Sequence, residues 1–271
     1  MKRKYSSTEL STIFFEALDL FNDCLGSDIS KENTIIAFFE PRNGIEVYEE
    51  LCKEHFPDLL AENYMADGYF DSFAAQAFVN DKEYGVLIRS DIGFSLSEIL
   101  YTFLHEISHL YCTRNEIQGG HFFERYCMGS GEEDGMFNAG YAIWREAIAD
   151  IMADSVLSDS TTVTLNEVKL EVDRLVESLS IANADSKKCM SLVIAYIMLS
   201  KEVAGTESWQ KAEAEIEKCF CFKDSMLLMI LRLVFDNLHE SPFWQITPEF
   251  IQELGGEYIA ALTFRTFRTQ L

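Results

Sequence analysis

Two histidines four residues apart are the residues of this sequence best suited to chemistry. His105 and His109 stand in the stretch HEISH, with Glu106 directly after the first histidine. On an α-helix, residues four apart lie on one face, so both imidazoles can point at one metal ion. The pattern therefore predicts a metal site, provided that this stretch is helical.

A third ligand for such a metal is offered further along the chain. A catalytic zinc site has three protein ligands and leaves the fourth position to water or substrate. The segment REAIADIMAD supplies Glu146 as a carboxylate ligand and Asp150 one helical turn later. We expect Asp150 to accept a hydrogen bond from a liganding histidine, which fixes the tautomer of the ring and raises its basicity.

Together these two segments resemble a known class of enzymes. HEISH followed on a later helix by EAIAD is similar to the gluzincin metallopeptidases, whose signature is HExxH plus ExxxD. The resemblance implies a zinc ion bound by His105, His109 and Glu146. It also implies that Glu106 is the general base, that Asp150 orients a histidine, and that the substrate is a peptide.

A narrower resemblance covers roughly residues 84–157. YGVLIRS before HEISH and the helix EAIADIMADSVL after it resemble the ImmA/IrrE family of bacterial metallopeptidases. Arg145 stands where thermolysin-like enzymes commonly carry asparagine, and Ser108 stands where ImmA-type proteins usually carry glycine. These departures concern the subdivision of the family and leave the proposed ligands unchanged.

Other polar residues compete for a role in the site. His121 is a rival third ligand, but the metzincin pattern would put glycine at position 112 and histidine at position 115, where this chain has cysteine and asparagine. A peptidase also needs a donor aimed at the developing oxyanion. The possible donors are His121, Tyr141 and His239, and the sequence does not choose among them.

A noncatalytic protein with a degenerate peptidase fold is the alternative to an enzyme. It would bind zinc for structural or regulatory purposes and use its helical tail as an interaction surface. Structural zinc sites are closed by four protein ligands. A fourth ligand such as His121 or Cys112 would therefore favour this alternative.

The helix that must carry HEISH has a recognisable start. Ser95 and Glu98 form a capping box, and Phe94 and Ile99 have the spacing of a hydrophobic staple. We therefore expect a helix that begins here and extends at least through His109.

A hairpin is expected to deliver the chain to this helix. The short apolar runs FAAQAFV and YGVLIRS are joined by the polar connection NDKE, which suits a turn between two strands. We expect the second strand, around Val86 to Ile88, to lie at the edge of the sheet beside the metal. An extended peptide substrate could then pair with its backbone.

Earlier in the chain, two helices flank a strand. A capping box at Ser6 and Glu9 precedes apolar positions with helical spacing, TIIAFFE has the character of a buried strand, and GIEVYEELCKEHF that of a helix ended by Pro57. After HEISH, glycine and charge predict an irregular stretch up to Gly140, with a helix resuming at Tyr141.

Everything from Asn166 onward is predicted to be helical, with EFIQELGGEYIAAL interrupted by its glycine pair. The fold class that follows is α+β. We expect a zincin-like domain with a small sheet and an active-site helix over residues 1–160. A mainly helical C-terminal part over residues 161–271 would pack on it.

Composition limits the partners. Acidic residues outnumber basic ones by 45 to 22, and the formal net charge of −23 repels nucleic acids and anionic membranes. Seven cysteines without CxxC spacing suggest reduced thiols. The basic start MKRK is followed by charged residues where a signal peptide needs an apolar run, so we expect a cytoplasmic protein.

Overall fold

The chain divides into two compact units. The computed structural model describes residues 2–60, 68–115, 125–129, 131–157 and 247–268. One unit comprises Met1–Asn115 with Met152–Thr161, and the other Glu116–Ile151 with Thr162–Leu271. The boundary falls within helix α6 (Glu132–Leu157), which contributes to both units. The expected division into residues 1–160 and 161–271 stays a prediction.

The described residues form a mixed α+β structure with a small sheet. Its strands are β1 (Thr34–Phe39), β2 (Ala75–Val79) and β3 (Tyr84–Arg89), in the order β1-β3-β2. β1 runs parallel to β3, whereas β2 runs antiparallel to it. The predicted strands and the predicted hairpin are thus confirmed. The short 3₁₀ helices are η1 (Lys31–Asn33), η2 (Pro41–Asn43) and η3 (Tyr69–Asp71).

The prediction that β3 is an edge strand is wrong, because β3 lies in the middle of the sheet. Val86 pairs with Ile36 of β1 on one side and with Ala77 of β2 on the other. Val86, Leu87 and Ile88 are at most 2% exposed. A continuous apolar run is typical of a strand buried on both faces. Both backbone edges of β3 are already paired, so no peptide can add to it.

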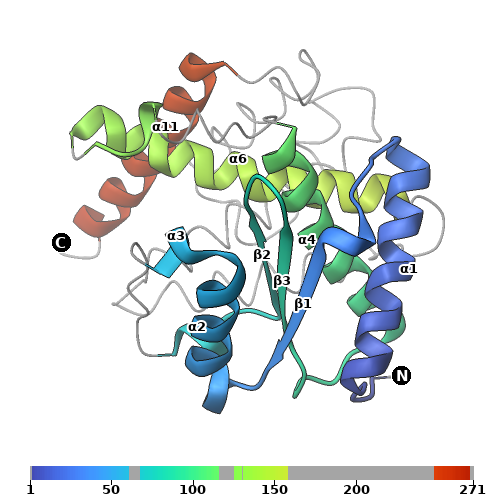
Figure 1. Ribbon diagram of the computed structural model, residues 1–271. Coiled ribbons are helices and arrows are strands. Elements are labelled where there is room, and N and C mark those ends of the chain that lie inside the picture. Colours follow the sequence, from blue (N-terminus) through green and yellow to red (C-terminus); the bar gives the residue numbers. More distant parts are fainter. Residues whose placement is uncertain (1, 61–67, 116–124, 130, 158–246, 269–271) are drawn as a thin grey trace. The chain divides into compact units, whose positions relative to one another are not determined.

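Helices cover both faces of this sheet (Figure 1). Val86 and Ile88 pack with α1 (Ser7–Leu25) and α4 (Leu96–Arg114), where the rings of Phe14 and Phe103 lie 5.3 Å apart. Leu87 packs on the opposite face with residues of α2 (Gly44–His55). The alternation follows from the strand period of two residues, and it makes α4 part of the core.

The first helices begin and end close to where the sequence predicts. The capping box of Ser6 and Glu9 starts α1, and α2 ends at His55. Pro57 opens the short helix α3 (Pro57–Leu60), consistent with the preference of proline for the first turn.

In the second unit, α6 begins at Glu132 and not at Tyr141 as predicted. Its first turn carries three acidic residues, whose negative charges interact favourably with the positive end of the helix dipole: Glu132, Glu133 and Asp134. The Asp134 carboxylate also accepts a hydrogen bond from the backbone N–H of Gly131 at 2.8 Å. These contacts outweigh the low helix propensity of the glycines.

The predicted interruption of the last helix is also wrong. Helix α11 (Pro248–Arg268) continues through Gly255 and Gly256. Gly255 lies against the backbone of α6, so its lack of a side chain serves packing and not chain reversal. The helices predicted between Asn166 and residue 246 lie outside the described residues.

The described residues also show the state of four cysteines and the character of the helices. Among the described residues, Cys24, Cys52, Cys112 and Cys127 form no disulfide with one another. Within the same part of the chain, no helix combines the length and the apolar character that crossing a bilayer requires.

Candidate metal centre

Helix α4 carries both histidines, and its start is built as the sequence predicts. The Ser95 hydroxyl accepts from the backbone N–H of Glu98, and the Glu98 carboxylate accepts from the backbone N–H of Ser95 at 2.8 Å. Ile99, Phe103 and Leu104 are buried in the core. This packing anchors the helix.

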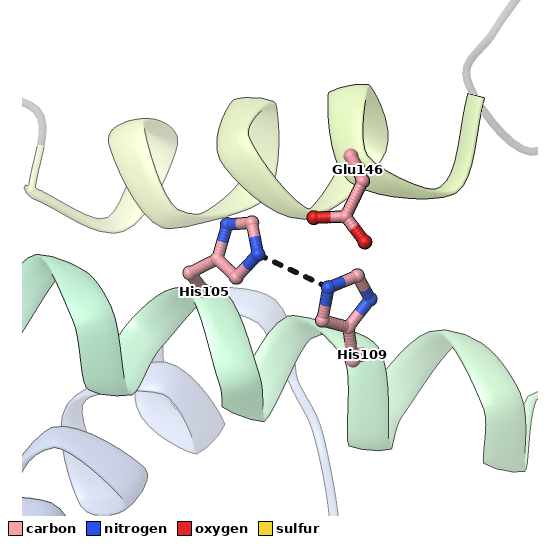
Figure 2. A group of neighbouring side chains, drawn as sticks. All are labelled: His105, His109 and Glu146. Atoms are coloured by element: carbon pink, nitrogen blue, oxygen red, sulfur yellow. Dashed lines mark hydrogen bonds between the residues drawn. The ribbon is translucent and has the colours of Figure 1, made fainter. Parts of the chain in front are cut away.

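The two imidazoles converge on one point. The Nε2 atoms of His105 and His109 lie 3.1 Å apart, and the rings stand at 86° to each other (Figure 2). Two nitrogens bound to one tetrahedral zinc at 2.0–2.1 Å would be separated by about 3.3 Å. The spacing in the structure is therefore close to what one shared metal ion requires.

Glu146 completes a group of three side chains that could hold a metal ion. One ligand atom from each of His105, His109 and Glu146 lies within 4.8 Å of the others, and in Figure 2 the carboxylate of Glu146 extends from α6 toward His109. His109 is buried, whereas His105 and Glu146 are half-buried. Two imidazole nitrogens and a carboxylate oxygen form a donor set that can hold a divalent metal ion.

Glu106 follows His105 on α4 and is only 8% exposed. A carboxylate at this depth needs polar partners, since an isolated buried charge is costly. The role of general base expected for Glu106 stays a prediction.

Asp150 is a second buried carboxylate, with 5% exposure. It lies one turn after Glu146 on α6, hence on the same face of that helix. This placement fits the predicted role of orienting a liganding histidine, which stays a prediction.

Of the three candidate oxyanion donors, the structure describes one, Tyr141. His121 and His239 lie outside the described residues. Tyr141 is described, and its ring stacks on Trp144 with centroids 6.4 Å apart. Because Tyr141 is five positions before Glu146, the two side chains point about 140° apart around α6.

Tyr101 is a residue that the sequence analysis missed. It lies one turn before His105 on α4, is half-buried, and places its ring centroid 6.4 Å from that of His105. The signal was present, because a spacing of four residues puts Tyr101 on the histidine face of the helix. A phenol can donate a hydrogen bond to a substrate oxygen.

Cys112, a possible fourth ligand, has a different neighbour. Its side chain is fully buried, and its thiol donates to the sulfur of Met152 at 3.4 Å. Among the described residues, the group that could hold a metal ion consists of His105, His109 and Glu146.

Comparison with known proteins adds no relative. No protein-family model, no curated protein and no solved structure matches this chain. The functional argument therefore rests on the residues of the site and on their geometry.

Proposed function

We propose that this protein is a zinc-dependent metallopeptidase, an endopeptidase of the gluzincin type and close to ImmA/IrrE enzymes. The observation that carries the proposal is the convergence of His105, His109 and Glu146 within 4.8 Å. The buried carboxylate of Glu106 on the same helix adds the base that such a reaction needs.

The reaction follows from the residues around the proposed metal. A zinc ion held by this group would polarise a carbonyl oxygen and lower the pKa of a bound water to about 7. Glu106 accepts a proton from the attacking water and later delivers it to the leaving amine. Asp150 holds the ring of a liganding histidine in one orientation. A donor such as Tyr101 stabilises the negative charge on the substrate oxygen.

The proposed substrate is a peptide or protein, and the proposed location is the cytoplasm. The strong negative charge of the chain makes nucleic acids and anionic membranes poor partners. It also favours the approach of neutral or basic peptides over acidic ones.

The competing proposal is a noncatalytic zinc protein. It requires a closed coordination sphere. The contact of Cys112 with Met152 speaks against Cys112 as the fourth ligand. Among the described residues, no fourth ligand joins His105, His109 and Glu146, which supports the enzyme over this alternative.

The deciding experiment compares the wild-type chain with Glu106→Gln. We expect both proteins to bind one zinc, and only the wild type to cleave members of a peptide library, because an amide cannot accept the proton from water. His109→Ala serves as the control that lacks the metal. Wild-type turnover by Glu106→Gln would refute the role of Glu106, and zinc binding without any cleavage by the wild type would favour the noncatalytic alternative.

A further inference from the structure

Helices α6 and α11 cross with their backbones in direct contact. A Cβ atom added at Gly140 of α6 would lie 1.9 Å from the carbonyl oxygen of Ile251, and one added at Gly255 of α11 would lie 1.7 Å from that of Met136. Real Cβ atoms essentially never come closer than 3.0 Å to another heavy atom. The crossing therefore requires glycine on both helices.

The neighbouring glycines show that the requirement is local. A Cβ at Gly135 of α6 would meet nothing within 4 Å, and one at Gly256 of α11 would meet only the sulfur of Met136, at 3.6 Å. Ile251 and Leu254, on the contact side of α11, are at most 1% exposed. The crossing is thus a specific, buried point of contact.

The same crossing lies on the helix that carries the third metal ligand. Glu146 follows Gly140 by six residues, which is about 9 Å along the helix axis. Seven residues beyond Glu146, Ala153 is fully buried, and nearby Val156 is only 7% exposed. The ligand therefore sits between two points at which α6 is held.

We propose that α11 positions Glu146 through the Gly140–Gly255 crossing and thereby sets the metal affinity of the site. This inference rests on the proposed metal centre. A side chain at either glycine would force the helices apart by more than about 1 Å, whereas metal–ligand distances tolerate only about 0.2 Å. Because α6 is one continuous helix, its displacement at Gly140 is transmitted to Glu146.

A double-mutant cycle on the full chain tests this directly, with zinc affinity measured by competition against a chelator. We expect Gly255→Ala to weaken zinc binding by about 10-fold or more, comparable to the loss of a residue that orients a ligand. In a Glu146→Ala background, the same substitution should cost almost nothing, because the ligand that α11 positions is already gone.

Gly256→Ala is the matched control, since it makes the same chemical change one position along α11 without the clash. We expect it to leave zinc affinity unchanged. Equal weakening by Gly256→Ala and Gly255→Ala would overturn the proposal. So would equal weakening by Gly255→Ala in the presence and absence of the Glu146 carboxylate, because α11 would then act on the fold as a whole.

A milder variant covers the case in which Gly255→Ala does not fold. Ile251→Ala removes a buried side chain from α11 without adding a clash, and the same cycle with Glu146→Ala should show the same coupling at smaller size. No coupling in this cycle would refute the proposal. If Glu146→Ala by itself leaves zinc affinity unchanged, the metal centre is wrong, which is a separate and distinguishable result.

Discussion

The Nε2 atoms of His105 and His109 lie 3.1 Å apart, because the two residues lie on the same face of α4 in successive turns. We expect that the His105→Ala and His109→Ala chains are each purified without zinc, because the two remaining protein ligands bind it only weakly. Native mass spectrometry of the purified chain measures the occupancy. Thr113→Ala, at an exposed position one turn further on, should retain the metal. Full occupancy in both histidine variants would contradict the site.

We expect Asp150 to affect how tightly zinc binds without being a zinc ligand itself. We expect Asp150→Ala to weaken zinc binding by about 10- to 100-fold, the usual effect of removing a carboxylate that orients a liganding histidine. Asp150→Asn, which keeps an acceptor oxygen, should lose less. Chelator competition measures both variants, and an unchanged affinity in Asp150→Ala would remove this residue from the site.

Tyr101 and Tyr141 can be distinguished as oxyanion donors. Because Tyr101 lies beside His105, we expect Tyr101→Phe to lower kcat by about 10²- to 10³-fold while zinc affinity is preserved. Tyr141→Phe is the matched control, since its ring stacks on Trp144, and we expect nearly normal turnover. Steady-state kinetics on a peptide found by library screening provides the measurement. The opposite pattern would assign the role to Tyr141.

The capping glutamates should make stability fall in acid. The Lys2 ammonium and the Ser95 backbone N–H lower the pKa of Glu98 to about 2, and the Ser6 backbone N–H does the same for Glu9, whose pKa is also about 2. A carboxylate with a lower pKa in the folded state than in the unfolded state stabilises the fold above its unfolded pKa. This contribution is lost as the pH falls from about 5 toward 2.

Urea unfolding across that range measures the effect. We expect Glu98→Gln to show a shallower loss of stability with falling pH than the wild type, because glutamine keeps an acceptor for the cap but does not titrate. An unchanged pH dependence in both Glu98→Gln and Glu9→Gln would exclude the capping boxes as its cause.

Gly85 should be essential to the middle of the sheet. A Cβ at this position of β3 would lie 2.6 Å from the ring of Phe56, which is only 2% exposed. We expect Gly85→Ala to lower the free energy of unfolding by about 1–3 kcal/mol, as overpacking of a core typically does. Gly93→Ala, whose nearest contact would be 3.8 Å away, should be close to neutral in the same urea titration.

The sequence by itself determined the local parts of the site. The capping box of Ser95 and Glu98 predicts where α4 begins, and the spacing of His105 and His109 places both rings on one face. These features depend on residues at most four positions apart, so helix geometry alone decides them. The hairpin of β2 and β3 was predictable for the same reason, since its two strands are joined by a short polar connection.

Only the tertiary structure decided which of these elements meet. The apolar run of β3 predicts burial on both faces but does not say which strands lie beside it, and only the pairing of Val86 with both Ile36 and Ala77 shows that it is central. Gly140 and Gly255 look like helix breakers in the sequence, yet each leaves room for the backbone of the other helix. Glu146 lies near the two histidines in space, although it follows His109 by 37 residues in the sequence. Such relationships arise from packing between distant segments, which local propensity does not encode.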